Sequence, residues 1–330
     1  MPEPRQLLKS IVPRTDESIQ SIAIRLAPLA LASTDELLRF GLNHSGLPLL
    51  STNSPAIDRL SELGGFDGVE MRGRSIEPTE RGFHIYKREV PPDWVSIDVR
   101  RLAPGALVSD GDEPFHRLAW QLVPLDCDLA TGEVLVDRCP RCHSHLKWAS
   151  IDCVNTCSVC QFDMRENSPR YVPTDRLESA RRLHRFLLGT GPTLPKPFDA
   201  ADDITSCRAT EWLAYFLHLP VGKCLRPSCH NAAAGITALH DWPSSFDDTL
   251  IELMTNWASL LAPREMRQRR FIAQVVDAIE RAGTTPLRDV LLKRATDTLG
   301  TTTSFDQSTY RRIVGTPRSK LARSSGVQTN

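Results

Sequence analysis

Two copies of the motif Cys-x-x-Cys lie close together near the middle of this 330-residue chain. The first pair is Cys139 and Cys142, the second is Cys157 and Cys160, and residues 143–156 separate them. Two such pairs at about this separation are typical of a zinc ribbon, in which each pair occupies a tight turn and the connecting hairpin completes a tetrahedron of four sulfurs. Four thiolates leave no coordination position for water, so we expect one structural Zn²⁺ rather than a catalytic ion.

The sequence leaves other uses of this cysteine-rich segment open. A thioredoxin-like redox site has one Cys-x-x-Cys beside a strand–helix junction, whereas this chain has two, without a βαβ pattern around them. A ribbon whose fourth ligand is His143, His145 or Cys153 is a further alternative, although we interpret Cys153 as a spare thiol or a small buried residue. A disulfide framework is disfavoured because thiols stay reduced in the compartment that we expect.

The compartment is predicted from the absence of targeting signals. The N-terminal residues 1–18 are interrupted by proline and charge, unlike a signal peptide. No apolar stretch approaches the roughly 18 residues that suggest a membrane span. We therefore expect a cytoplasmic protein that does not enter a membrane. Acidic and basic residues balance at 40 each, so any nucleic-acid contact must come from a local patch.

A second motif, HRLAWQL, occupies residues 116–122, shortly before the cysteines. Together with the Cys-Pro-x-Cys pair that follows, it resembles the central region of the TniQ family, related to TnsD, whose members select insertion targets for certain bacterial transposons. The stretch TDESIQSIAIRLAPLA from residue 15 is similar to the opening of that family, and the stretch around Trp242-Pro243 is similar to its WP-containing helical segment. The resemblance covers most of residues 13 to about 260 in scattered motifs.

One part of the family pattern is missing from this chain. Where the family has the first Cys-Pro-x-Cys of an earlier finger, residues 103–106 read APGA, and where it has Cys-x-x-His-Gly, residues 127–132 read CDLATG. Three of the four ligands of that finger are lost, so we predict no metal there. We expect His116 to orient the backbone beside Trp120 rather than to bind metal, and we expect packing to replace the lost zinc, from Trp120, Leu122, Val134 and Leu135.

These patterns predict a mainly α-helical fold with a small zinc-ribbon β region, in four parts. Residues 1–95 form a helical N-terminal module, residues 96–172 the zinc-finger region, residues 173–300 a helix-turn-helix-like domain, and residues 301–330 a disordered basic tail. Alternating short stretches interrupted by proline make residues 73–95 a candidate for strands.

Hydrophobic spacing near the N-terminus predicts two short helices. The first is expected to be capped by Thr15 or Asp16, with a buried face of Ile19, Ile22 and Leu26. The second is expected to be capped by Ser33 or Thr34, with a core of Leu37, Leu38 and Phe40. Late in the chain, a helix starting at Pro243 should bury an apolar stripe of Phe246, Leu250, Leu253 and Trp257.

The family resemblance implies a function of binding, not catalysis. It implies an adaptor that links a target-recognition component, either a DNA site or a CRISPR guide-RNA complex, to the transposon AAA+ ATPase, which recruits the transposase. Family members form head-to-tail homodimers, which extends the implied partners to a second copy of this chain. The sequence also lacks H-E-x-x-H, G-x-S-x-G and a strand-associated G-x-G-x-x-G motif, so we do not expect an enzyme.

Two other function classes remain as alternatives to the adaptor: a stand-alone zinc-ribbon and helix-turn-helix DNA-binding regulator, and a hydrolase whose active site is assembled only in space. A run of arginines in the C-terminal half is the candidate surface for phosphate or partner contact, or else an ordinary solvated helix face. It consists of Arg264, Arg267, Arg269 and Arg270.

Overall fold

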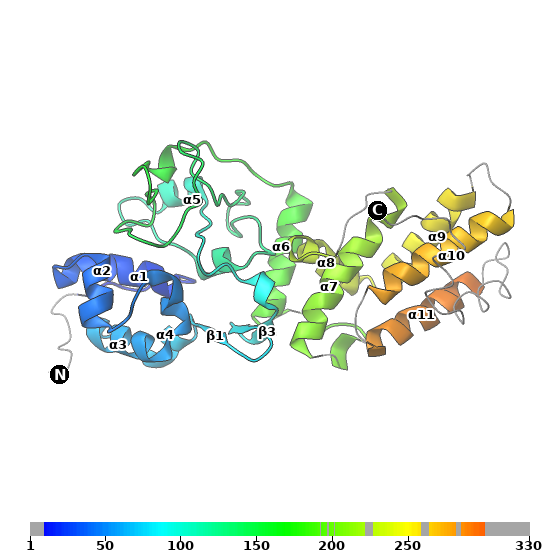
Figure 1. The fold of residues 1–330 in the computed structure, drawn as a ribbon, viewed down its shortest axis with the longest axis horizontal. Helices are drawn as coiled ribbons and strands as arrows, with labels where there is room; N and C mark the ends of the chain where they lie inside the picture. The colour runs from blue at the N-terminus through cyan, green and yellow to red at the C-terminus, as the bar shows by residue number, and fades with distance from the viewer. Residues whose placement is uncertain are drawn as a thin grey trace. The chain divides into compact units, whose positions relative to one another are not determined.

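The computed structural model divides into two compact units, Met1–Pro192 and Thr193–Asn330 (Figure 1). The residues that it describes are 10–191, 193–196, 198–200, 202–221, 227–258, 264–281 and 285–300. The predicted basic tail, residues 301–330, lies outside them. Helices make up 53% of the structure, which confirms the mainly helical prediction. None of the described helices is both long and apolar enough to cross a membrane.

The first unit begins with α1 (Ile19–Leu26), which is followed by a 3₁₀ turn, η1 (Ala27–Ala30). Its N-cap is Ser18, whose Oγ accepts from the Ser21 N–H, and not the predicted Thr15 or Asp16. The predicted apolar face is completely buried: Ile19, Ile22 and Leu26. The helix is therefore held by its core contacts and by a cap two or three residues later than the sequence suggested.

The second helix, α2 (Thr34–Glu36), is capped as predicted by Ser33, which forms a capping box with Glu36. It continues directly into a π-helical turn, η2 (Leu37–Gly41). A π-helical turn contains more residues than an α-helical turn, so the face on which each following side chain lies is shifted. Leu37 and Leu38 are buried as predicted, but Phe40 is 72% exposed and is not a core residue.

The strands predicted within residues 73–95 are present. They form a three-stranded antiparallel sheet in the order β1 (Ile76–Pro78), β2 (Phe83–Ile85) and β3 (Arg88–Val90). The cysteine region, in contrast, has isolated β-bridges, such as that between Arg138 and His145, and no named strand among its described residues. The sheet therefore lies before the cysteines in the sequence, and the predicted zinc-ribbon region contains isolated β-bridges in place of strands.

The other elements of the first unit are short, except for two helices of eleven and fourteen residues, α3 and α6. In chain order they are η3 (Leu47–Thr52), α3 (Ser54–Gly64), α4 (Gly68–Arg72), η4 (Pro92–Trp94), α5 (Pro104–Ser109), η5 (Leu118–Gln121), η6 (Met164–Glu166) and α6 (Thr174–Leu187). One buried apolar cluster joins the N-terminal helices to the cysteine region, because Leu26 of α1 and Leu60 of α3 belong to the same cluster as Trp148, Cys139 and Cys157.

The second unit is helical throughout its described residues. Its elements are η7 (Phe198–Ala200), α7 (Asp203–Leu217), η8 (Leu219–Val221), η9 (Cys229–Asn231), α8 (Ala232–His240), α9 (Ser244–Ala258), α10 (Arg264–Glu280) and α11 (Thr285–Gly300). Its core is rich in stacked aromatic rings, with Phe216 5.1 Å from Trp212 and 4.7 Å from Phe246 between ring centroids.

Helix α9 buries the stripe that its sequence predicted: Phe246, Leu250 and Leu253 are at most 2% exposed. The side chain of Trp257, the fourth predicted member, lies outside the described residues. Helices α7 and α8 approach each other closely at Gly235, where a Cβ atom would lie 1.7 Å from the Thr210 carbonyl oxygen. Glycine is therefore required at this contact.

Candidate metal centre

The four cysteines of the two Cys-x-x-Cys pairs come together in the first unit. All four sulfur atoms lie within 4.8 Å of one another, with 3.6 Å between Cys139 and Cys160 and 3.7 Å between Cys142 and Cys157. A tetrahedral Zn²⁺ with Zn–S bonds of about 2.3 Å requires sulfurs roughly 3.8 Å apart. The cluster can therefore hold one metal ion, and among the described residues it is the one such group of His, Cys or acidic side chains.

The two turns that carry these cysteines have the same backbone structure. The His143 N–H donates to the Cys139 carbonyl over 2.9 Å, and the Gln161 N–H donates to the Cys157 carbonyl over 3.0 Å. The first cysteine of each turn also donates its own N–H to the carbonyl five residues later, over 2.9 Å and 3.0 Å. This repeated hydrogen-bond pattern aims both sulfurs of each pair toward the other pair.

Each turn places a non-glycine residue in the left-handed region. His143 has a φ of 60° and Gln161 a φ of 57°. Glycine is the usual residue for this conformation, because a Cβ atom crowds the adjacent carbonyl. The turns therefore carry backbone strain that metal binding and the surrounding hydrogen bonds must offset.

The cysteine thiols influence one another's protonation. Hydrogen bonds from the Ser144 N–H and hydroxyl lower the pKa of Cys142 to about 6. The Phe162 N–H lowers the pKa of Cys160, but burial and the neighbouring sulfurs outweigh it and raise that pKa to about 12. Four neighbouring thiols thus do not all ionise by themselves. A divalent cation would displace the remaining protons, which suits a site that forms when metal binds.

The alternative fourth ligands are not part of the cluster. Nε2 of His145 lies 2.7 Å from Nη2 of Arg138, and Nδ1 of His145 lies 3.7 Å from Asp137. His143 is exposed, with its ring outside the donor group, and Cys153 is an exposed free thiol. The structure therefore brings together the four cysteines that the sequence predicted.

The other described cysteines lie outside this four-sulfur group. Cys127, Cys207 and Cys229 are buried, and burial raises the pKa of Cys127 to about 11. Cys224 lies outside the described residues. A second cysteine site is therefore absent from the part of the chain that the structure describes.

A buried carboxylate holds the APGA stretch, residues 103–106, where we predicted no metal. Glu133 is 1% exposed, and its two carboxylate oxygens accept from the N–H groups of Gly105 (2.9 Å) and Ala106 (3.0 Å), at the start of α5. Burial raises the pKa of Glu133, although these two hydrogen bonds oppose the shift. Nothing in the sequence marks Glu133 as a structural residue, because an isolated glutamate belongs to no motif.

A second carboxylate fixes the turn within the CDLATG stretch, residues 127–132. Asp128 accepts from Nε1 of Trp120 over 3.0 Å and from both the N–H and the hydroxyl of Thr131 over 2.9 Å. Trp120 and Leu122 are buried as predicted, whereas Val134 and Leu135 are only partly buried. The predicted apolar packing is therefore supplemented by two buried carboxylates.

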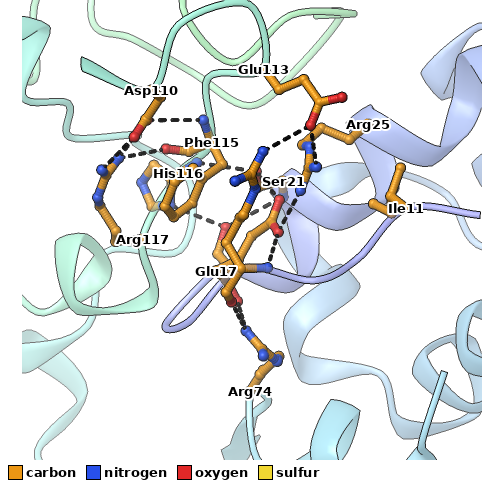
Figure 2. A network of polar contacts seen from close by, with 12 residues as sticks. Ile11, Glu17, Ser21, Arg25, Arg74, Asp110, Glu113, Phe115, His116 and Arg117 are labelled. Carbon is orange, nitrogen blue, oxygen red and sulfur yellow. Dashed lines mark hydrogen bonds and ion pairs between the residues drawn. The ribbon is translucent and has the colours of Figure 1, made fainter. Parts of the chain in front are cut away.

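The N-terminal motif and the HRLAWQL motif form one structural unit (Figure 2). The Ser18 N–H donates to the His116 carbonyl over 2.8 Å, and the His116 N–H donates to Oγ of Ser21 over 3.1 Å. Leu118 N–H donates to the Asp16 carbonyl over 2.6 Å. Segments about 100 residues apart in the sequence thus pair through their backbones.

The His116 side chain fills the space between this pair of segments and the cysteine region. Its Nδ1 lies 3.1 Å from Oγ of Ser18, and its ring meets Trp120 and Trp148 edge-on, at centroid distances of 5.3 Å and 4.7 Å. Burial holds the pKa of His116 well below its usual value, so the ring is neutral. The ring lies beside Trp120, and His116 is not a member of the metal-binding group; its predicted role in orienting the local backbone stays a prediction.

A buried ion pair stabilises the same region. Glu17 is fully buried and accepts from Nη1 of Arg25 (2.7 Å), Oγ of Ser21 (2.8 Å) and the Arg14 N–H (2.9 Å). Figure 2 shows this network between α1 and the segment that contains His116. Because the buried charge is paired and fully hydrogen-bonded, it fixes the geometry of the N-terminal segment.

The four candidate arginines belong to the second unit and lie in the first two turns of α10. Arg270 is exposed, while the side chains of Arg264, Arg267 and Arg269 lie outside the described residues. Their helical placement agrees with the predicted helix. Their role in binding phosphate or a partner stays a prediction.

Comparisons with known proteins add no relative: no protein-family model matches the chain, and no curated protein is significantly similar to it. The chemistry of the metal centre therefore rests on its geometry.

Proposed function

We propose that this chain is a non-enzymatic adaptor for transposon target-site selection, of the TniQ kind. One structural Zn²⁺, bound by the four clustered cysteines, would hold the first unit in a fixed form. The adaptor would link a target-recognition component, either a DNA site or a CRISPR guide-RNA complex, to the transposon AAA+ ATPase. Its action is binding, and its partners include a second copy of the chain.

The observation that carries the proposal is the convergence of three motifs on one residue. The segment D-E-S, residues 16–18, pairs with the HRLAWQL segment through Ser18 and His116. The His116 ring packs against Trp148, which lies between the two cysteine pairs in the sequence. These are the stretches on which the resemblance to the TniQ family rests. Motifs that are scattered in the sequence support a common origin better when they build one core than when each stands alone.

The chemistry of the cysteine cluster supports binding over turnover. Four thiolates complete a tetrahedral ion, so the site offers no position for a water or substrate ligand. Its turns are joined to the core of α1 and α3. Such a centre contributes stability to a docking scaffold and supplies no Lewis acid for a reaction.

The charge of α9 favours the adaptor over a stand-alone DNA-binding regulator. Helices α8 and α9 are joined by residues 241–243, the short connection expected in a helix-turn-helix. However, α9 contains no lysine or arginine, and its exposed charged residues are Asp248 and Glu252, while Asp247 forms an ion pair with Arg294 of α11. A recognition helix in the major groove lies close to phosphates, which would repel these carboxylates. Helix α9 is therefore better suited to contact with protein.

The test is affinity capture from the native host with the tagged full-length chain as bait. Recovery of an AAA+ ATPase, alone or with a guide-RNA complex, supports the adaptor and identifies its target-recognition component. Recovery of DNA alone, with salt-sensitive binding of the purified chain to a defined duplex, supports the regulator and contradicts the adaptor. The Cys157→Ser variant, which lacks one metal ligand, should lose these partners. The matched control is Cys153→Ser, which should retain them.

A further inference from the structure

Arg100 is a buried cation beside the metal centre, and the mechanism of the adaptor assigns it no role. Its side chain is fully buried, and its backbone N–H donates to the Leu146 carbonyl over 2.6 Å. Its Nη1 donates to the Val154 carbonyl and its Nη2 to the Thr156 carbonyl, each over 2.6 Å. The guanidinium thus reaches from the segment before α5 to the residues that immediately precede Cys157.

This buried charge has no carboxylate partner in the described part of the chain. The side-chain contacts of Arg100 there are the two carbonyls and the Trp148 ring, and its Nε has no hydrogen-bond partner. The Trp148 ring lies 5.8 Å from the guanidinium carbon, which offers a weak cation–π contact at most. A buried charge without a counter-charge is strongly unfavourable, so a negative group must act from nearby.

The cysteine cluster is placed to supply that negative charge, because Nη2 of Arg100 donates to the carbonyl of Thr156, the residue directly before Cys157. Burial lowers the pKa of Arg100 to about 10, and a charge on Cys157 opposes that shift. A divalent cation bound by four thiolates leaves two net negative charges, which are also costly inside a protein. The positive charge of Arg100 and the net negative charge of the metal-loaded cysteines therefore compensate each other.

We propose that Arg100 is the counter-ion and positioning residue of the metal centre. Its charge offsets one of the two net negative charges of a four-thiolate site that holds a divalent cation. Its two donated hydrogen bonds hold the carbonyls of Val154 and Thr156. They thereby position the second cysteine turn, which begins at Cys157, so that its sulfurs face the first pair. This role rests on the metal-binding part of the proposed function and is independent of the transposition partners.

A neighbouring arginine provides a matched control. Arg101 also donates to backbone carbonyls, and these are the carbonyls of Trp120, Leu122 and Val123, in and directly after the HRLAWQL motif. Substitution of either arginine removes a cation and several hydrogen bonds to carbonyls. Only substitution of Arg100 removes the charge next to the thiolates.

The experiment measures the Zn²⁺ affinity of the full-length chain by competition with a chromophoric chelator. Outer-shell partners of metal ligands typically contribute ten- to a hundredfold to affinity, so Arg100→Met should weaken Zn²⁺ binding by that factor. Arg100→Lys keeps the charge and should recover part of the loss, whereas Arg101→Met should bind Zn²⁺ like the unsubstituted chain. Where Arg100→Met does not fold, as judged by circular dichroism, the comparison is made between Arg100→Lys and Arg101→Lys.

The absorption spectrum of bound Co²⁺ gives a second measurement, because it reports the geometry of the four sulfurs. Arg100→Met should alter the Co²⁺ bands, and Arg101→Met should leave them unchanged. Equal Zn²⁺ affinities for the unsubstituted chain and Arg100→Met would overturn the role of Arg100 and leave the metal centre intact. An unsubstituted chain that binds no metal would overturn the metal centre itself, and with it this proposal.

Discussion

The Tyr86 hydroxyl donates to Oδ1 of Asp16 over 2.5 Å, and both residues have left-handed backbones, with φ values of 55° and 58°. Asp16 lies in the N-terminal segment, and Tyr86 lies in the turn between β2 and β3. The second carboxylate oxygen of Asp16 accepts from the Ala119 N–H over 3.2 Å. One carboxyl group therefore joins the N-terminal segment, the sheet and the HRLAWQL segment. The left-handed backbones of Asp16 and Tyr86 are strained, and these contacts offset that strain.

The Asp16 carboxyl should make stability depend on pH. Burial raises its pKa above the usual 3.8, although hydrogen bonds from Tyr86 and Ala119 oppose the shift. The folded chain thus holds this proton more tightly than the unfolded chain, and its contribution is greatest below pH 3.8 and is lost as pH rises through the folded pKa. Asp16→Asn should remove this dependence.

Urea unfolding between pH 4 and 7 measures this effect as the difference in unfolding free energy between the two proteins. The metal centre is the same in both, so its own pH dependence cancels in the difference. Tyr86→Phe removes a hydrogen bond that lowers the pKa of Asp16, and should move the loss of stability to higher pH. A difference that stays constant across this pH range would contradict the prediction.

Glu133 should stabilise the APGA stretch, residues 103–106. Glu133→Ala leaves the N–H groups of Gly105 and Ala106 without their acceptor, which should cost about 1–3 kcal/mol of unfolding free energy. Denaturant unfolding measures this loss, and elemental analysis should still find one zinc per chain. Glu178→Ala, which breaks an exposed pair with Arg181, is the control and should cost less than about 1 kcal/mol. An equal effect of the two substitutions would show that the buried Glu133 contributes no more stability than an exposed ion pair.

Local patterns predicted those parts of the fold that short segments determine. The spacing of the four cysteines predicted the cluster, and Ser33 with Glu36 predicted a helix start, because each depends on residues close in the sequence or on a fixed metal geometry. The position of Phe40 was predicted wrongly because a π-helical turn changes the face on which a residue lies.

Long-range polar contacts were not predictable in the same way. Glu133 accepts from N–H groups 27 and 28 residues earlier, and Arg100 donates to carbonyls 54 and 56 residues later. In the sequence both resemble ordinary surface residues, since nothing local indicates that the chain will bury them. Only the fold shows which backbone N–H and carbonyl groups these charged side chains bind.

The left-handed residues of the two cysteine turns offer sites for stabilisation. Glycine at position 143 would relieve the crowding of Cβ, so His143→Gly should raise the unfolding free energy by about 0.5–1 kcal/mol. Gln161→Gly should have a similar effect. Lys147→Gly, at an exposed position without a left-handed backbone, should lower it by about 0.5–1 kcal/mol. Thermal unfolding of the zinc-loaded proteins decides this, and a loss of stability in His143→Gly would contradict the assignment of strain.

Gly235 should be essential to the second unit. A Cβ atom there would overlap the Thr210 carbonyl oxygen, so Gly235→Ala forces α7 and α8 apart and should cost about 1–3 kcal/mol. Gly68→Ala is the control, because a Cβ at Gly68 meets nothing within 4 Å. Zinc content should be unchanged in both variants. Unfolding followed by Trp fluorescence measures the cost, and equal stability of the two variants would argue against the close packing of α7 and α8.

Removal of the metal should loosen the N-terminal helices as well as the cysteine turns. Cys139 and Cys157 belong to the same buried cluster as Leu26 of α1 and Leu60 of α3. When the metal is removed, the four sulfurs repel one another or move apart, and this change disturbs that core directly. Addition of a strong chelator should therefore increase amide hydrogen exchange in α1 and α3, while α7 and α8, which belong to the other compact unit, should keep their protection. Cys157→Ser should reproduce this pattern without a chelator, and Cys153→Ser, at an exposed thiol, should not. Exchange that increases only within residues 139–160 would mean that the metal orders the cysteine turns alone and that the N-terminal core is stable without it.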